Sequence, residues 1–420
     1  MKSPELLVPA GTYEKMTYAF AYGADAVYAG VPQYSLRARE NDFNEQKLIG
    51  AIDYAHSLDK KIYLTMNIFP HNRKVKGFTQ MLEKVAGMKP DGLIMADPGM
   101  IMVAREKHPE LEIHLSTQAN TINWQTVKFW QNIGLKRIIL SRELRIDEIK
   151  EIKQHVPDME LESFVHGAIC IAYSGRCLLS NYFNHRDANQ GTCTNACRWE
   201  YKVYEGPGEE TADASYYIEE SERPGNLMPI DEDEHGTYIM NAKDLSAIEI
   251  LKEMREAGID SFKVEGRTKS IYYLSVITRA YRLALDAVES GQPITKTVAD
   301  EVYAVANRGY VTGFLERNPL AEGQNYEQSH SQYQTRAFLG LVKEWDNFDN
   351  MALISVRGRF EIGDVAEIVD KDKVIQFKIE KIKDGDGRDL QIAHPGGIDV
   401  KLNLPEAPGA FSILRKVLAV

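Results

Sequence analysis

The chain has 420 residues and a formal net charge of −11, with 44% hydrophobic and 26% charged residues. This composition is ordinary for a globular protein, and the length suits one large domain and a smaller one. An acidic chain without a basic tail is not a protein that holds nucleic acid mainly through high positive charge. No apolar run reaches the roughly 18 residues of a membrane span, and the first residues lack a signal peptide. We therefore expect a cytoplasmic protein without a membrane segment.

Short apolar runs alternate with amphipathic stretches through the first two thirds of the chain. This alternation is typical of parallel βα units whose strands are buried on both faces. Eight such runs predict a (β/α)8 barrel, the TIM-like fold of the α/β class, and a ninth candidate, Tyr238–Met240, complicates the count. The eight predicted strands are Leu6–Pro9, Ala26–Ala29, Ile62–Met66, Leu93–Ala96, Ile113–Ser116, Ile138–Ser141, Glu162–Val165 and Phe262–Val264.

Polar residues collect where these strands end. In such barrels the chemistry lies at the carboxyl ends of the strands, so we expect these side chains to surround one mouth. For any single residue a helix cap or a buried ion pair is the simpler explanation, but that explanation is weaker for the whole set. The candidates at strand ends are Asn67, Asp97, Gln118, Asn120, Arg142, Glu143, His166, Asn241, Lys243, Asp244, Glu265 and Arg267.

Two further stretches carry positive charge near this mouth. The loop after Gly30 contains Tyr34, Arg37 and Arg39, and its two arginines suit a carboxylate or phosphate, although pairing with Glu40 or Asp42 is equally plausible. The stretch from His71 to Lys76 (HNRKVK) is a candidate for a local basic face, as is Arg357–Arg359. A solvated surface loop is the alternative for both.

All four cysteines fall within 28 residues, at Cys170, Cys177, Cys193 and Cys197, with the spacing C-x6-C-x15-C-x3-C. Two disulfides suit small secreted chains better than this one. A structural zinc ion bound by four thiolates usually shows tighter C-x2-C pairs. An iron–sulfur cluster also takes four thiolates and tolerates irregular spacing. From the spacing alone, a zinc site and an iron–sulfur cluster are equally well supported. The simplest alternative is four buried cysteines that bind no metal.

The domain boundaries follow from changes in pattern. Residues 1–320 are expected to form the barrel, with an insertion at about 168–236 that carries the cysteines and ends in an acidic, Gly- and Pro-containing excursion. Residues 321–336 are polar and nearly free of aliphatic side chains, which is typical of a linker. Residues 337–420 alternate as short strands and predict a small antiparallel β-barrel domain.

The run from Glu162 to Cys170 (ESFVHGAIC), followed by GRCLLS from Gly175, resembles the signature of the collagenase-like U32 peptidase family. The resemblance covers nearly the whole chain and is closest to the branch of this family that hydroxylates tRNA using prephenate. The stretches that carry it include PELLVPAG, FAYGADAVYAG, YSLRAR, HLSTQAN, GTCTNACRWEY, DEHGTYIMNAKDL and KVEGRTKS. The chain is shorter than some members of that branch around residues 205–220.

The resemblance implies formation of 5-hydroxyuridine at the wobble position of tRNA, so the anticodon stem-loop and prephenate would be partners. It also implies an iron–sulfur cluster, [4Fe-4S], bound by the four cysteines, which moves the balance away from zinc. Catalytic roles are expected for His166, Asn67, Gln118, Glu265 and Lys243. Substrate-binding roles are expected for Arg37, Arg39, Tyr34, Arg142, Arg267 and Asn120, because a dicarboxylate needs cations and a flipped base needs aromatic and polar contacts.

Two other functions remain open at this point. A U32-type peptidase would need an activated nucleophile or a metal-bound water, yet the sequence has neither G-x-S-x-G nor H-E-x-x-H. A thiol nucleophile near His166 is conceivable, but a cysteine that binds a cluster is not free to attack. The third reading is a zinc-stabilised RNA-binding protein, which would not need so many polar residues at the strand ends. A homo- or hetero-oligomer is compatible with all three.

Overall fold

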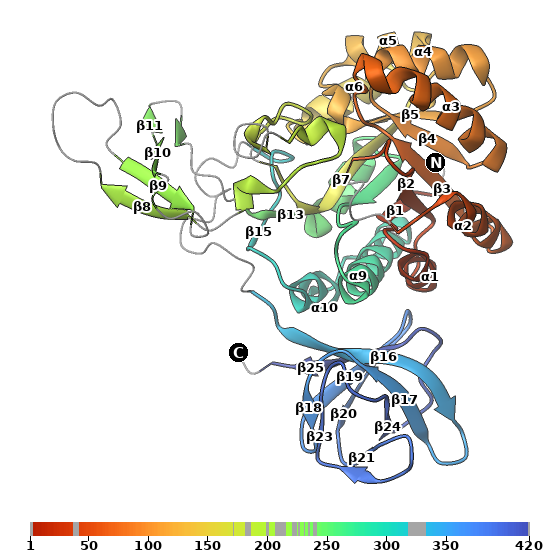
Figure 1. Ribbon diagram of the computed structural model, residues 1–420, viewed down its shortest axis with the longest axis vertical. Helices are drawn as coiled ribbons and strands as arrows, with labels where there is room; N and C mark the ends of the chain where they lie inside the picture. Colours follow the sequence, from red (N-terminus) through yellow and green to blue (C-terminus); the bar gives the residue numbers. More distant parts are fainter. Residues whose placement is uncertain are drawn as a thin grey trace.

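The computed structural model describes residues 3–36, 42–170, 172–180, 186–198, 201–205, 216–220, 225, 227–230, 232–233, 236–237, 242–317 and 333–418. In these residues the chain forms an N-terminal barrel of strands covered by helices and a C-terminal antiparallel β-domain (Figure 1).

Eight parallel strands close the barrel in the order β14-β1-β2-β3-β4-β5-β6-β7, and β7 pairs with β14 to complete the circle. The predicted TIM-like barrel is therefore confirmed, and each of the eight predicted strands overlaps one of the observed strands. Tyr238–Met240 lies outside the described residues. The strands are β1 (Glu5–Pro9), β2 (Ala26–Gly30), β3 (Lys61–Met66), β4 (Gly92–Met95), β5 (Ile113–Leu115), β6 (Arg137–Ile139), β7 (Glu160–Ala168) and β14 (Ser261–Val264).

The wall of the barrel is extended next to the end of β7. There β13 (Asp244–Ser246) pairs antiparallel with residues His166 to Ala168, and β15 (Tyr310–Val311) pairs parallel with β13. These two short strands extend the sheet beside the mouth of the barrel. At this point the chain leaves β7 and enters the stretch from Cys170 to Cys197, which we call the cysteine-bearing segment.

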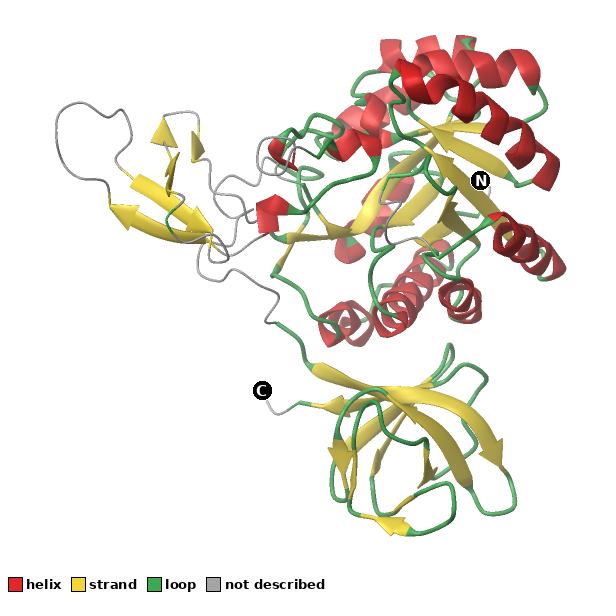
Figure 2. Ribbon diagram, viewed as in Figure 1, coloured by secondary structure: helices red, strands yellow, loops and turns green. Residues whose placement is uncertain are grey.

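Helices cover the outside of the barrel (Figure 2). No helix in the described ranges is long and apolar enough to cross a bilayer. The helices are α1 (Tyr13–Ala21), α2 (Glu45–Ser57), α3 (Asn72–Met88), α4 (Pro98–Lys107), α5 (Trp124–Asn132), α6 (Ile146–His155), α8 (Leu251–Glu256), α9 (Ile271–Glu289) and α10 (Lys296–Asp300).

Local sequence signals determine where most of these helices begin. Six of them start after a side chain that accepts a hydrogen bond from the backbone N–H three residues on, as N-cap residues do. These caps are Thr12, Asn44, Asp97, Asn123, Ser270 and Thr295. Helix α3 differs, because its N-cap His71 makes no such bond.

The C-terminal domain is a curved antiparallel sheet in the order β20-β19-β25-β16-β17-β24-β21-β22. The predicted antiparallel β-domain is thus confirmed, although its described edge strands β20 and β22 do not pair with each other. The principal strands are β16 (Arg336–Asp346), β17 (Met351–Val356), β19 (Val365–Val369), β20 (Val374–Lys378), β24 (Val400–Asn403) and β25 (Ile413–Val417); β21 (Ile382–Lys383) and β22 (Asp389–Leu390) are short.

The two domains pack against each other on the side of α1 and α9. Arg415 is 2% exposed and binds Glu367 of its own domain at 2.7 Å and Glu301 of the barrel domain. The Tyr22 hydroxyl donates to the Val369 carbonyl at 2.7 Å. Because these partners are buried, the contact is part of the folded core, and it lies away from the barrel mouth.

Candidate active site at the mouth of the barrel

A cavity of about 220 Å³ opens at the carboxyl ends of the barrel strands. It reaches from inner residues of the strands, such as Ile94 and Ile139, to the cysteine-bearing segment that follows β7. Three cations and two carboxylates line it, together with all four cysteines. The charged residues are Arg142, Lys263, Arg267, Glu143 and Glu265.

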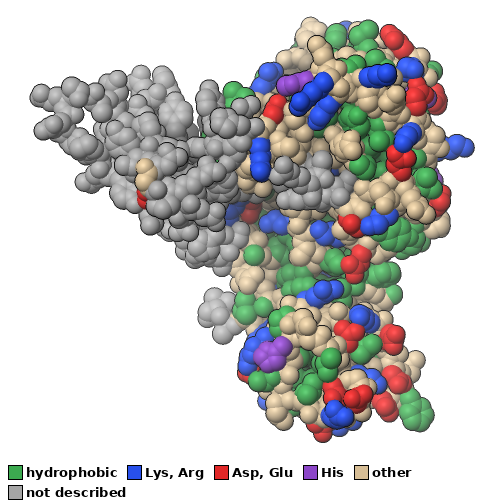
Figure 3. All heavy atoms as spheres, in the orientation of Figure 1, with side chains coloured by type: hydrophobic (Ala, Val, Ile, Leu, Met, Phe, Trp, Pro, Cys, Tyr) green, Lys and Arg blue, Asp and Glu red, His purple; other side chains and the backbone are tan. Residues whose placement is uncertain are grey.

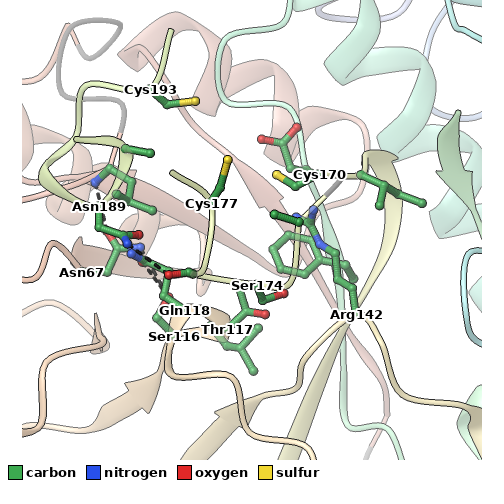
Figure 4. A pocket seen from close by; sticks show the side chains of 18 of the residues that line it. Asn67, Ser116, Thr117, Gln118, Arg142, Cys170, Ser174, Cys177, Asn189 and Cys193 are labelled. Atoms are coloured by element: carbon green, nitrogen blue, oxygen red, sulfur yellow. Dashed lines mark hydrogen bonds between the residues drawn. The ribbon is translucent and has the colours of Figure 1, made fainter. Parts of the chain in front are cut away.

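A chain of hydrogen bonds orients the amides on one side of the cavity (Figure 4). Asn67 Oδ1 accepts from the Leu36 N–H at 3.1 Å, and Asn67 Nδ2 donates to Ser116 Oγ at 3.4 Å. Ser116 Oγ in turn donates to Gln118 Oε1 at 3.2 Å. The Gln118 side chain then has its Nε2 buried without a partner, although the residue is only 6% exposed. A buried amide donor that is left unpaired is costly, so this group marks a place for a ligand acceptor.

The inner end of the cavity is formed by cations and aromatic rings. Lys263 Nζ binds Glu162 Oε1 at 2.7 Å and lies 4.3 Å from the centre of the Tyr28 ring. The Arg142 guanidinium lies 4.0 Å over the Phe164 ring and donates to the Ala168 carbonyl at 3.0 Å. Burial lowers the pKa of Lys263, and Glu162 opposes that shift.

Arg142 and Arg267 differ in how firmly they are held. Arg142 Nε is buried without a hydrogen-bond partner. Arg267 is 5% exposed, and its Nη1 lies 3.5 Å from Ser35 Oγ and 3.4 Å from Thr65 Oγ1. Arg267 lines the cavity, so its positive charge lies next to any anion that binds there.

The cysteine-bearing segment is fixed to the barrel by close backbone contacts. Gly175 has a φ of +73°, and a Cβ there would lie 2.3 Å from the carbonyl oxygen of Gln118, so only glycine fits. Asn189 Nδ2 donates to the Gly175 carbonyl at 3.0 Å. The segment therefore covers the mouth at a defined position, directly against the Gln118 loop.

None of the four cysteines is in a disulfide, which is contrary to the disulfide reading. Burial raises the pKa of the Cys177 thiol, and the neighbouring Cys170 and Cys193 raise it further. Figure 4 shows Cys177 between these two residues at the cavity. Cys193 Sγ accepts from the Asn195 N–H at 3.4 Å.

The four thiols line one cavity and can therefore serve together as ligands of a metal centre. Zinc takes four sulfur atoms at about 2.3 Å from one point. An iron–sulfur cluster takes its thiolates on separate iron atoms. Four thiolates are a donor set that either group accepts.

The structure brings together nine of the predicted site residues and separates the others. Asn67, Gln118, Arg142, Glu265 and Arg267 line the cavity, as do the four cysteines. His166, Lys243, Tyr34 and Asn120 do not line it. Tyr34 packs edge-on against Phe78, and Asn120 accepts from Ser141 Oγ at 2.8 Å. Arg37 and Arg39 lie outside the described residues.

A β-bulge explains the position of His166. The pairing between β7 and β14 shifts register there, since Lys263 pairs with Phe164 but Val264 pairs with His166. A bulge adds one residue to a strand and re-aims the side chains beyond it. His166 therefore faces a buried cluster of tyrosines, with Nδ1 3.2 Å from the Tyr281 hydroxyl and Nε2 3.4 Å from that of Tyr310. Burial lowers the pKa of His166 to about 3, so its ring is neutral at pH 7.

Sequence reasoning missed several residues of the cavity. Lys263 stands inside a strand that was predicted to be buried on both faces (SFKV), and this isolated charge was the available signal. Glu143, by contrast, was among the strand-end candidates; it lines the cavity and accepts from the Ser174 N–H at 3.1 Å. Ser116 and Thr65 carry no recognisable signal, because small hydroxyl residues are common in strands.

Comparison with known proteins identifies the relatives of this chain. The sequence pattern of "Peptidase family U32" matches residues 11–325, and that of the "Peptidase family U32 C-terminal domain" matches residues 334–415. The chain is 48% identical over 430 residues to tRNA hydroxylation protein P of Escherichia coli (strain K12), covering 97% of this chain and 95% of the relative. The protein of the same name from Haemophilus influenzae is also 48% identical, over 96% and 94% of the two chains.

A more distant relative also covers both domains. It is tRNA hydroxylation protein P1 of Bacillus subtilis (strain 168), 38% identical over 99% of this chain and 95% of its own length. These alignments extend over almost the full length of each partner, so they include the barrel, the cysteine-bearing segment and the C-terminal domain. The chain described here belongs to peptidase family U32.

Proposed function

We propose that this chain hydroxylates tRNA, converting a uridine at the wobble position to 5-hydroxyuridine, with prephenate as the oxygen donor and an iron–sulfur cluster bound by Cys170, Cys177, Cys193 and Cys197. The observation that carries the proposal is that all four thiols line the cavity at the barrel mouth. The names of the relatives support tRNA hydroxylation.

The proposed reaction requires the cavity to bind a nucleobase and an anionic oxygen donor at the same time. Replacing C5–H by C5–OH oxidises the base by two electrons, and the oxygen donor is reduced by the same two. The side chains of Asn67 and Gln118 offer amide groups to the edge of a uracil ring, as single-stranded bases are read. Arg142 and Arg267 offer positive charge to the carboxylates of prephenate. The cluster would supply electron transfer, because four cysteines leave no iron without a protein ligand.

The cavity encloses the reactants between the barrel and the cysteine-bearing segment. Gly175 brings that segment into direct contact with the backbone of the Gln118 loop at one side of the cavity. Phe164 and Tyr28 give the inner end an apolar surface next to Lys263 and Arg142. In such a setting charged groups interact more strongly with a bound anion than they would in water.

The peptidase reading has little support from the geometry. A thiol peptidase needs a base within hydrogen-bond reach of its cysteine. His166 is the histidine nearest to Cys170 in the sequence, but both of its ring nitrogens face tyrosine hydroxyls behind the cavity wall. Its lowered pKa also disfavours an imidazolium ion that could stabilise a thiolate.

The test is mass spectrometry of tRNA nucleosides from a deletion strain grown without oxygen, so that no oxygen-dependent enzyme masks the loss. We expect 5-hydroxyuridine and its derivatives to disappear, and to return with the intact gene but not with Cys177→Ala or Cys193→Ala. Leu178→Ala is the matched control, because Leu178 is an exposed residue of the same segment. Persistence of the modified nucleosides in the deletion strain would refute the tRNA reading.

The cluster is tested separately on purified protein. Anaerobically purified wild-type protein should contain iron and inorganic sulfide, and Cys193→Ala should lack both while keeping the wild-type circular dichroism spectrum. Unchanged iron content in Cys193→Ala would remove the cysteines from the metal site, whatever the nucleoside analysis gives.

A further inference from the structure

Three segments meet at the rim of the cavity and carry an excess of positive charge. They are residues 69–76, which include the start of α3, and residues 172–180 and 186–197 of the cysteine-bearing segment. The Phe69 N–H donates to the Asn189 carbonyl at 3.2 Å, and Gln190 Nε2 donates to the Phe69 carbonyl. His71 Nε2 lies 3.9 Å from Asp187 Oδ2. The Asn189 side chain also donates to the Gly175 carbonyl at 3.0 Å, which ties in residues 172–180. The three segments therefore form one surface, which we call the basic rim.

The basic rim contains five Lys and Arg residues but only one carboxylate, Asp187. The five are Arg73, Lys74, Lys76, Arg176 and Arg186. In the described part of the chain, none of them forms an ion pair. Elsewhere exposed lysines are commonly paired, as in Lys84–Glu45 at 2.6 Å and Lys107–Glu83 at 2.7 Å.

This local excess stands out against the rest of the molecule. The whole chain is acidic, with 61 Asp and Glu residues against 50 Lys and Arg. On the face shown in Figure 3, acidic and basic side chains are interspersed over both domains. A cluster of unpaired cations on an acidic protein does not serve solubility, and folding does not require it. We therefore look for an anionic partner.

The start of α3 adds to the positive potential of the basic rim. This helix has 17 residues, and its first turn contains Arg73 and Lys74 but no acidic residue. Its N-cap His71 makes no side-chain hydrogen bond. Cations at a helix N-terminus oppose the helix dipole, so this arrangement lowers helix stability while it favours a bound anion.

Two observations within and beside the cavity show what kind of anion fits. Tyr173 lines the cavity and is 59% exposed, which leaves a face of its ring open at the mouth. Deeper inside, Gln118 Nε2 is buried and unpaired, and so is positioned to donate to a planar acceptor such as a nucleobase carbonyl. Proteins bind single-stranded nucleic acid with three kinds of group: cationic side chains that contact the phosphates, an accessible aromatic ring that stacks on a base, and a pocket whose polar groups hydrogen-bond to a base.

We propose that the basic rim binds the phosphodiester backbone of a single-stranded RNA loop on either side of the nucleotide that enters the cavity, and that Tyr173 stacks on a base next to it. This inference rests on the proposed function, whose substrate it would hold. It also explains how an acidic protein binds RNA: the contact uses a small local excess of charge, with no need for a basic domain.

The experiment measures binding of an anticodon stem-loop RNA to the full-length protein as a function of salt. The test variant is the triple change Arg73→Gln, Lys74→Gln and Lys76→Gln. The matched control is Lys61→Gln, Lys89→Gln and Lys136→Gln, because these three lysines are exposed and lie at the opposite end of the barrel. Both variants lose the same charge, and glutamine is compatible with a helix.

We expect the rim variant to bind at least tenfold more weakly, and its plot of log affinity against log salt to flatten by about 2, since each phosphate contact with a single strand contributes about 0.7 to that slope. The control variant should keep the wild-type affinity and slope. Tyr173→Ala should weaken binding by about fivefold or more with no change of slope, because stacking does not depend on counterions. Equal affinities and slopes for the rim variant and the wild type would overturn the proposal and leave an acidic protein surface as the partner to seek.

The outcome can be separated from that of the proposed function. If the wild type binds the stem-loop through the rim but the deletion strain keeps 5-hydroxyuridine, the rim stands and the proposed function falls. If the deletion strain loses 5-hydroxyuridine and the rim variant restores it with wild-type RNA affinity, the function stands and the rim falls. Circular dichroism on both triple variants verifies that each one is folded.

Discussion

The two ends of the barrel interior use the same kinds of residue in opposite ways. At the amino ends of the strands, Arg137 is 2% exposed and binds Glu5 at 2.5 Å, Glu160 at 2.8 Å and Glu162 at 3.2 Å. Glu162 also binds Lys263 at 2.7 Å. Each of these five charged groups has a partner, and the network closes this end of the barrel.

At the carboxyl ends of the strands the polar groups are left incomplete. Gln118 Nε2 and Arg142 Nε are buried without partners, and four thiols that form no disulfide line the same cavity. Buried polar groups are normally satisfied, so incomplete ones gathered at a cavity indicate a ligand that completes them. The charged groups at the amino ends of the strands therefore stabilise the barrel, whereas the polar groups at the carboxyl ends are positioned to bind a ligand.

The largest effect on stability should come from breaking the network of ion pairs around Arg137. Arg137→Met would leave the fully buried Glu162 with less compensation and would strip Glu5 of its main partner, so we expect a loss of about 3–5 kcal/mol in the free energy of unfolding. Urea unfolding followed by circular dichroism measures it.

The control for Arg137→Met is Lys296→Met, which also removes one charge but from an exposed pair with Asp300. It should unfold at the wild-type urea concentration. A double variant, Arg137→Met with Glu162→Gln, should lose less than the sum of the two single changes, because both remove the same interaction. An additive result would mean that the network is not coupled.

The pH dependence of stability sharpens the same comparison. Burial raises the pKa of Glu5, but the charge and hydrogen bonds of Arg137 outweigh it and bring this pKa down from 4.5 to about 2. A carboxyl group whose pKa is lower in the folded state stabilises the protein above the unfolded pKa, and this stabilisation is lost as the pH falls towards the folded pKa. The window for Glu5 therefore runs from about pH 4.5 to about pH 2.

The matching experiment compares wild type with Glu5→Gln, which cannot ionise. The variant should be less stable at pH 6, and the difference should shrink by about 1.1 kcal/mol between pH 4 and pH 3. Because other acid-sensitive groups are common to both proteins, they cancel in this difference. A difference that stays constant over this range would contradict the lowered pKa.

The barrel was predictable because its signal is repeated and local. Short apolar runs between amphipathic stretches located all eight strands, and the polar residues after them located Asn67, Gln118, Arg142, Glu265 and Arg267 at the cavity. The position of the cysteine-bearing segment also followed, since it leaves the end of β7 at the mouth.

The orientation of single side chains near strand ends was not predictable in the same way. His166 would lie on the same face as Phe164 if β7 were regular, but a bulge turns it away from the cavity. A bulge depends on the pairing of two distant strands, and one sequence does not reveal it. The closed network was missed for a related reason, because Glu5, Arg137 and Lys263 come from strands that become neighbours only when the barrel closes.

The smallest effect on stability should come from the open end. Gln118→Leu removes the acceptor of the Ser116 hydroxyl, which costs about 0.5–1.5 kcal/mol, but it also removes a buried donor that has no partner, which offsets a similar amount. We therefore expect the free energy of unfolding to change by less than about 1 kcal/mol, while tRNA hydroxylation in the complemented deletion strain falls at least tenfold.

Ser116→Ala is the control for the lost hydroxyl contact, since it breaks the same hydrogen bond but keeps the amide of Gln118. It should retain more hydroxylation than Gln118→Leu. If Gln118→Leu instead destabilised the protein by more than about 2 kcal/mol, Gln118 would have a structural role like that of Arg137, and the distinction between the two ends of the barrel would fail. A stable protein that no longer hydroxylates tRNA would mean that the unpaired amide is kept at this site for its ligand and contributes nothing that the fold requires.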